Sequence, residues 1–198
     1  MIRRLYTMLL YLLLPLVLLR LLWRSVKAPD YRRRWAERFG MFAPPAEWGG
    51  LWVHAVSVGE VQAILPLIRQ VVEQNPAMPI TVTTTTPTGS ARVREQLGDQ
   101  VFHVYLPYDL PPALTGFIRR VRPRALLMVE TEIWPNLLYL CRRHGIYTLL
   151  ANARLSEKSA RRYARLGSFT RQTFAGIDHI AAQAEADAAR FRELGVPA

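Results

Sequence analysis

The chain has 198 residues, of which 51% are apolar, and this is enough for one large domain, or one and a half small ones, with a packed core. Its 26 Lys and Arg residues against 15 Asp and Glu give a formal net charge of +11. Such a charge favours a phosphate-bearing partner: nucleic acid, an anionic membrane or a phosphorylated substrate. The single cysteine, Cys141, excludes an internal disulfide and a cysteine-based metal cluster, and we expect it to be a buried helix residue.

Residues 1–27 predict a membrane anchor. Residues 5–19 carry no charge, and the apolar run resumes after Arg20 as far as Trp23. A spanning helix needs at least ~17 apolar residues. The segment therefore either spans a bilayer or lies deep in its interface. No small-residue cleavage site follows it, which argues against a cleaved signal peptide.

The segment that follows, residues 28–50, is expected to be a basic linker or helix. Only Arg3 and Arg4 precede the apolar run. The basic residues that lie within or after it are Arg20, Arg24, Lys27, Arg32, Arg33, Arg34 and Arg38. The positive-inside rule then predicts a single anchor in the inner membrane with the body of the protein in the cytoplasm. The basic cluster, with Tyr31 and Trp35, suits anionic lipid head groups, although a solvated charged helix has the same pattern.

Residues 51–198 alternate between strand-like and helix-like patterns. Strands are expected over 51–57, 79–86, 101–107, 125–131, 147–153 and 179–183. Helices are expected over 60–74, 87–98, 111–123, 134–145, 156–167 and 185–195. This alternation predicts an α/β fold, with a Rossmann-like parallel sheet covered by helices on both faces.

Two acidic loops follow expected strands, where ligands bind in sheets of this kind. Glu60 lies in the first turn of a helix, where an acid also stabilises the helix start, so this residue has a structural as well as a catalytic interpretation. Glu130 follows a continuous apolar run, where a charge is costly without a partner. Glu132 is expected to be solvated or paired with an arginine, and His54 to be a satisfied core histidine.

Other polar residues and one glycine occupy the same loops. Gly59 allows a tight turn or the close approach of a ligand. The loop after the fifth expected strand carries Asn152, Arg154 and Ser156. The chain has no GxGxxG, GxxxxGK[ST] or HExxH motif, which argues against a dinucleotide site, a P-loop and a zincin.

Four ordered motifs carry a family resemblance. They are WVHAVSVGEVQAILPLI, TVTTTTPTG, ETEIWPNLL and NARLSEKSARRY, behind an N-terminal apolar segment. In this order they resemble the bacterial 3-deoxy-D-manno-octulosonate (Kdo) transferases, which glycosylate lipid A. Those enzymes are much longer and have a GT-B architecture of two Rossmann-like domains. The resemblance implies that residues 51–198 form the acceptor-binding domain, and that a second, donor-binding domain lies outside this chain.

The resemblance also implies an activity. Family members transfer Kdo from CMP-Kdo to lipid A precursor, a bis-phosphorylated glycolipid (lipid IVA), with inversion and without a metal or cofactor. By motif, Glu60 matches the proton acceptor and Glu130 a carboxylate suited to stabilising the transition state. The residues that the motifs assign to substrate binding are Ser57, Gly59, Arg154 and Ser156.

Two other functions stay open at this stage. One is a different GT-B transferase acting on a lipid-linked sugar, which a Gly-rich loop after the first strand would favour; SVGE has one glycine. The other is a membrane-tethered module that binds a phosphoglycolipid without chemistry. Nucleic acid explains the net charge less well, because the basic excess clusters beside the anchor and no recognition module is present.

Overall fold

The computed structural model describes residues 2–196, so Met1 of the expected anchor and residues 197–198 of the expected domain lie outside the described residues. The helices are α1 (Ile2–Lys27), α2 (Val58–Gln74), α3 (Pro87–Leu97), α4 (Pro111–Val121), α5 (Pro135–Arg143), α6 (Glu157–Arg165), α7 (Ser168–Phe174) and α8 (Glu185–Glu193). The strands are β1 (Leu51–His54), β2 (Ile80–Thr84), β3 (Phe102–Tyr105), β4 (Ala125–Val129), β5 (Tyr147–Ala153) and β6 (His179–Ala182). Three short 3-10 helices are η1 (Pro29–Arg32), η2 (Trp35–Phe39) and η3 (Gly98–Gln100).

The six strands form one parallel sheet in the order β3-β2-β1-β4-β5-β6. This is the strand order of the doubly wound Rossmann fold, in which the chain reverses direction across the sheet between β1 and β4. The predicted α/β class is therefore confirmed. Continuous apolar runs such as that of β4 are explained by burial on both faces of the sheet.

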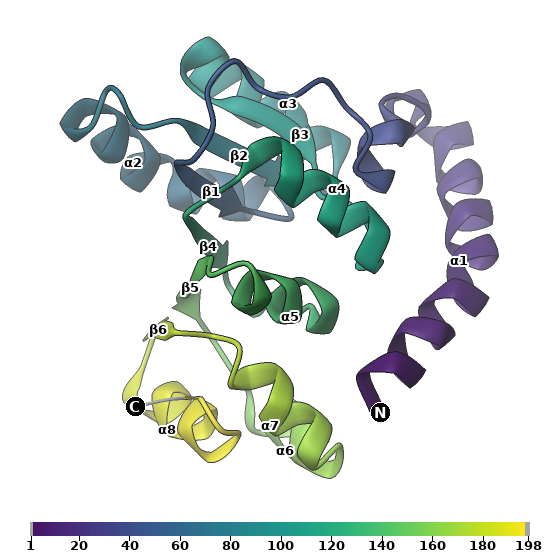
Figure 1. Ribbon diagram of the computed structural model, residues 1–198, viewed down its shortest axis with the longest axis vertical. Coiled ribbons are helices and arrows are strands. Elements are labelled where there is room, and N and C mark those ends of the chain that lie inside the picture. Colours follow the sequence, from purple (N-terminus) through teal and green to yellow (C-terminus); the bar gives the residue numbers. More distant parts are fainter. Residues whose placement is uncertain (1, 197–198) are drawn as a thin grey trace.

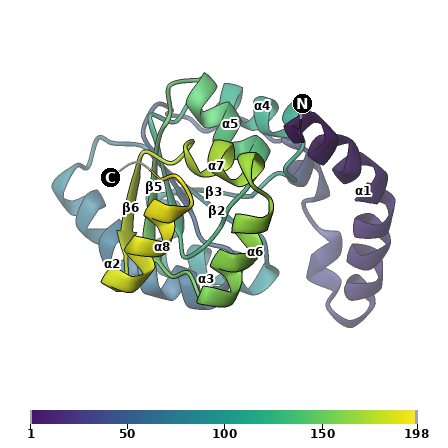
Figure 2. The same cartoon turned by 90° about the horizontal axis from the view of Figure 1, so that it is seen from below.

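Helices cover the two faces in two groups (Figures 1 and 2). Alternate residues of β1 separate the two cores: Val53 packs with α2 and α3, whereas Trp52 packs with α4 and α5. The rings of Trp52 and Phe117 of α4 lie 4.4 Å apart between centroids. The second group continues into α7 and α8, which contribute Phe174 and Phe191.

Several elements differ in extent from the predicted ranges. β1 ends at His54 rather than at residue 57, because Ser57 already caps α2. α7 was not predicted: Gly167, at φ 54°, separates it from α6 by a conformation that interrupts a helix. Cys141 is buried in α5 as expected. His54 is fully buried, with Nδ1 2.9 Å from Thr83 Oγ1, but its Nε2 has no hydrogen-bond partner among residues 2–196, so the expectation of a fully satisfied histidine is wrong.

Residues 28–50 contain η1 and η2 and pack against the sheet. Glu37 accepts a hydrogen bond from the backbone N–H of Tyr105 at 2.8 Å. Arg34 donates to the carbonyl of His103 at 2.9 Å and forms an ion pair with Glu37. These contacts hold the segment beside β3.

Helix α1 runs along the outside of this domain (Figure 1). Residues near both of its ends contact the domain. Near its start, Arg3 donates to Asn136 at 3.0 Å and Tyr6 donates to Asp109 at 2.9 Å. Near its end, Leu21 and Ser25 are buried. One stripe of α1 is more covered than the rest over the whole length of the helix: Arg3, Tyr6, Thr7, Leu10, Leu14, Leu18, Leu21 and Ser25.

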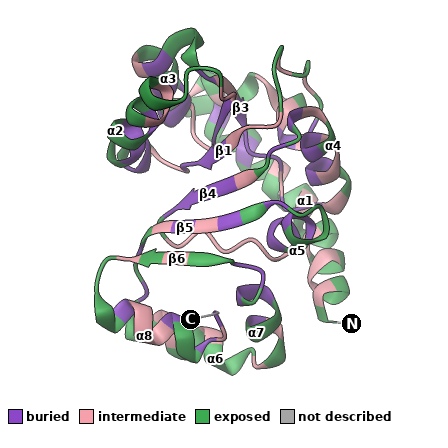
Figure 3. Ribbon diagram, turned by 60° about the vertical axis from the view of Figure 1, so that its left-hand side comes forward, coloured by how far each residue is buried: buried purple, intermediate pink, exposed green. Residues whose placement is uncertain are grey.

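Much of α1 is exposed (Figure 3), and the exposed stripe opposite the covered one is apolar. It consists of Leu5, Met8, Leu9, Leu12, Leu16, Leu19, Trp23 and Val26, each at least half exposed. α1 is the one helix in residues 2–196 that is long and apolar enough to cross a membrane. An uncovered apolar stripe of this length identifies α1 as a surface that needs a further apolar partner.

Candidate functional site

The candidate site lies at the carboxyl edge of the sheet, where β1 and β4 are neighbours. The loop after β1 leads to Glu60 and the loop after β4 carries Glu130 and Glu132. The helices that follow these strands, α2 and α5, lie on opposite faces of the sheet, which is the arrangement that places a ligand-binding crevice at the strand ends in doubly wound folds. Two loops that are 70 residues apart in the chain thus meet at one point.

Glu60 is buried at the start of α2, with 7% of its surface exposed. Its Oε1 accepts a hydrogen bond from the hydroxyl of Ser57 at 2.8 Å, and its Oε2 accepts one from the N–H of Val56 at 2.8 Å. The N–H of Glu60 in turn donates to Ser57 Oγ at 3.3 Å, as in a capping box. These bonds fix the carboxylate in place, and each of its oxygens keeps a further lone pair for a ligand.

Glu130 adopts a left-handed backbone conformation, with φ at 62°, immediately after β4. Its N–H donates to the carbonyl of Ala151 at 2.9 Å, which continues the β4–β5 ladder by one bond, and its side chain is exposed. A non-glycine residue in this conformation costs about 1–2 kcal/mol. The strain turns the chain sharply at the end of a buried strand.

Glu132 is half-buried, and the expectation of a solvated or arginine-paired side chain is wrong. The indole N–H of Trp134 donates to its Oε2 at 2.8 Å, and among residues 2–196 no arginine or lysine forms an ion pair with it. Burial, with smaller contributions from the charges of Glu60 and Glu130, raises the pKa of Glu132 to about 7, against the hydrogen bond from Trp134. The three carboxylates therefore belong to one electrostatic cluster.

The other sequence-predicted residues lie around this cluster. Ser57 caps α2, and Ser156 caps α6 by accepting from the N–H of Ser159 at 3.2 Å. Arg154 is exposed, and its carbonyl accepts a hydrogen bond from Thr131, which joins the β5–α6 loop to the loop that carries Glu130. Gly59 lies inside the first turn of α2 at an ordinary φ, so of the two roles expected for this glycine the tight turn is wrong, and the close approach of a ligand stays a prediction.

Asp109 was missed by sequence reasoning. It is 4% exposed and accepts hydrogen bonds from the backbone N–H groups of Asn136 and Leu137 as well as from Tyr6. It thereby ties the start of α5, directly after the Glu132 loop, to α1. An acidic residue between an apolar strand and the Pro111–Pro112 helix start was the available signal.

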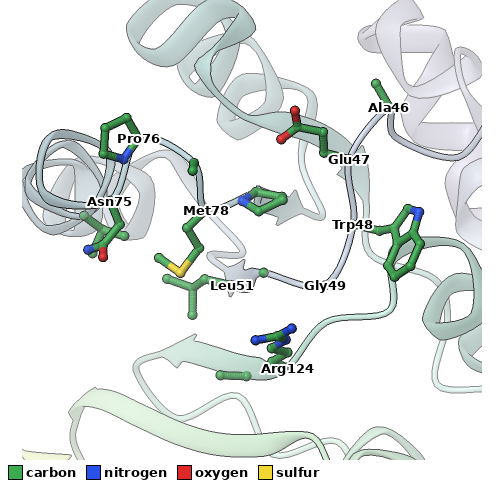
Figure 4. Close-up of a pocket in the computed structure, with 14 residues that line it drawn as sticks. Ala46, Glu47, Trp48, Gly49, Leu51, Asn75, Pro76, Met78 and Arg124 are labelled. Carbon is green, nitrogen blue, oxygen red and sulfur yellow. The ribbon is translucent and has the colours of Figure 1, made fainter.

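A wide cavity lies at the opposite, amino edge of the sheet (Figure 4). It measures about 970 Å³ and is bounded by the loops around Trp48 and Met78, with Arg124 on one wall. Glu47 is its one carboxylate. The cluster of three carboxylates therefore lies at the carboxyl edge of the sheet and not in this cavity.

Comparison with known proteins identifies the family. Residues 33–198 match the model of the family described as 3-deoxy-D-manno-octulosonic-acid transferase (kdotransferase). The chain belongs to this family. All three carboxylates of the cluster lie within the matched region.

Curated relatives carry the same name. The chain is 44% identical to the 3-deoxy-D-manno-octulosonic acid transferase of Haemophilus influenzae over 97% of its own length and 45% of the relative. It is 37% identical to the transferase of Bordetella pertussis over 99% of this chain and 47% of the relative. A probable mitochondrial 3-deoxy-D-manno-octulosonic acid transferase of Arabidopsis thaliana is 38% identical over 81% of this chain and 36% of the relative. The chain thus spans about half the length of the curated relatives that it matches.

Proposed function

We propose that this chain forms the acceptor-side half of an inverting GT-B glycosyltransferase that transfers Kdo from CMP-Kdo to lipid A precursor. The observation that carries the proposal is the convergence of Glu60, Glu130 and Glu132 at the point where the sheet reverses its strand order. The family membership supports the transferred sugar. In this proposal a donor-binding half completes the site, and the isolated chain is inactive.

Glu60 is the proton acceptor in the proposed reaction. The acceptor hydroxyl oxygen attacks the anomeric carbon of Kdo, the bond from that carbon to the phosphate oxygen of CMP breaks, and CMP leaves with the electron pair. The hydroxyl proton passes to Glu60, whose carboxylate is held in position by Val56 and Ser57. Attack from the face opposite CMP inverts the anomeric centre.

Glu130 stabilises the positive charge that develops on the sugar ring as the donor bond breaks. Its side chain is exposed directly after a buried strand and its backbone is strained, a combination that is typical of functional positions. Ser57, Gly59, Arg154 and Ser156 surround the acceptor in this proposal. No metal or cofactor takes part in it.

Helix α1 lies in the plane of the inner membrane, with its exposed apolar stripe in the hydrocarbon and the domain on the cytoplasmic side. A spanning orientation would break the contacts of Arg3 and Tyr6 with the domain, whereas an in-plane orientation keeps them. The double substitution Leu12→Glu with Leu16→Glu should release the protein from carbonate-washed membranes. Leu166→Glu, at an exposed leucine outside α1, is the matched control. Continued membrane retention of the double variant would contradict this orientation.

A transfer assay tests the activity. We define the complete protein as the gene product that contains residues 1–198 together with any region that follows them. The complete protein should move Kdo from CMP-Kdo to a tetraacylated lipid A precursor, and residues 1–198 alone should not. Binding of the glycolipid without any transfer by the complete protein would instead establish a binding module.

A further inference from the structure

A pocket of about 420 Å³ lies between α1 and the loops that follow β2, β3 and β4. Arginines line it from two elements, Arg20 and Arg24 from α1 and Arg38 from η2. Its one acidic residue is Glu132, so the pocket adjoins one member of the carboxylate cluster. Positive charge therefore predominates on its walls.

Arg38 is the informative residue, because it is a buried cation with an unused donor. Its guanidinium donates to the carbonyl of Thr85 at 3.0 Å and lies 4.3 Å from the ring centroid of Tyr105, yet the residue is only 5% exposed. Its Nε is buried and has no hydrogen-bond partner among residues 2–196, and none of the ion pairs in that range includes Arg38. A buried guanidinium without an anion is costly.

Tyr108 supplies a second unused group on the same wall. Its hydroxyl is buried and finds no hydrogen-bond partner within residues 2–196. Two unpaired polar groups on one lining are rare in folded proteins, and they indicate a missing polar ligand. An arginine Nε and a hydroxyl both donate to an oxyanion.

We propose that this pocket binds a phosphate group of the acceptor glycolipid, held by Arg38 and Tyr108 and flanked by Arg20 and Arg24. The proposal rests on the proposed function, which supplies a phosphorylated lipid acceptor. Arginine is the side chain best suited to phosphate, which its planar fork can bind with two parallel hydrogen bonds. The pocket adjoins both α1, whose outer stripe lies in lipid, and Glu132, so a phosphate there would place the attached sugar beside the carboxylates.

The test uses two acceptors and a matched control. The complete protein, in detergent micelles, is assayed with the bis-phosphorylated acceptor and with the same glycolipid after removal of its phosphates. Arg38→Gln should raise the acceptor KM about 10- to 100-fold for the phosphorylated acceptor and leave it unchanged for the other. Arg38→Lys should give a KM for the phosphorylated acceptor between those of the unchanged protein and of Arg38→Gln. Arg69→Gln, the same change on an exposed arginine of α2, should have no effect on either acceptor.

A second variant covers the case in which Arg38→Gln fails to fold. Arg20 and Arg24 are exposed on α1, so Arg20→Gln with Arg24→Gln should fold and show a several-fold rise in KM with the same dependence on phosphate. An equal rise in KM for both acceptors would overturn the proposal, as would a change in the KM of the donor alone. An effect seen only in vesicles of anionic phospholipid would assign the pocket to phospholipid head groups instead.

Direct binding measurements distinguish a failure of the proposed transferase function from a failure of the proposed phosphate pocket. If the complete protein transfers no sugar to any acceptor, the binding of the phosphorylated and dephosphorylated glycolipids is measured by calorimetry. A preference for the phosphorylated form that Arg38→Lys weakens would uphold the pocket without the transferase reaction. Equal binding of the two forms would refute it.

Discussion

The amino and carboxyl edges of the sheet differ in the side chains and cavities that they hold. The amino edge holds the larger hollow, but its lining is mostly apolar and brings no pair of acids together. The carboxyl edge gathers three carboxylates, a strained residue and an arginine-lined pocket. At this edge strand ends meet helix starts, and the reversal of strand order opens a crevice, so ligand-binding chemistry depends on topology more than on cavity size.

The largest expected effect is at Glu60. Glu60→Gln in the complete protein should lower the transfer rate by ~10²-fold or more, the scale of general-base loss, while the acceptor still binds. Glu60→Asp should recover little, because the carboxylate would no longer reach the hydroxyl. Steady-state rates and thermal midpoints check this, with Glu73→Gln at the exposed end of α2 as control. Parallel losses of stability and activity would make Glu60 a helix-capping residue only.

At Glu130, charge and backbone strain can be separated. Glu130→Gln should lose most turnover with little change in stability, because the amide keeps the shape and removes the charge. Glu130→Gly should also lose turnover, yet its thermal midpoint should stay level or rise, because glycine adopts a φ of 62° without strain. Near-normal turnover of the glutamine variant would assign Glu130 a structural role.

A substitution at the amino edge should have the opposite effect, lowering stability while leaving turnover unchanged. A Cβ on Gly50 would lie 1.8 Å from the carbonyl oxygen of Pro79, so Gly50→Ala forces the backbone apart and should cost about 3 kcal/mol of unfolding free energy. The turnover of the protein that remains folded should be unchanged. Denaturant unfolding and activity per folded molecule measure the two quantities. A loss of turnover without loss of stability would place chemistry at this edge.

The smallest expected effect concerns the pKa of Glu132. The folded protein holds a proton on Glu132 up to about pH 7, whereas the unfolded chain releases it near 4.5. The free energy of unfolding should therefore fall by about 1–2 kcal/mol as the pH rises through this window, after discounting for solvent screening. Glu132→Gln keeps an acceptor for Trp134 and should flatten the profile. An unchanged profile would show that other groups cause it.

Much of this fold follows from local patterns. The apolar run of β4, the β-branched run of β2 and the amphipathic helices between them predict a parallel α/β sheet, because each pattern reports the burial of its own element. α7 and the exact end of β1 did not follow, since a glycine conformation and a cap decide them. The four motifs also identified the family, which the comparisons then showed.

The tertiary structure alone decided which residues face one another. Glu60 and Glu132 are brought together by the pairing of β1 with β4. The local sequence around either residue does not indicate which strand pairs with its own. The same holds for Arg38, which is one arginine of a basic run in the sequence and a buried cation beside Tyr105 in the fold. Composition and periodicity report how each residue meets solvent, whereas pairing and pocket lining are long-range contacts that arise only when the whole chain packs.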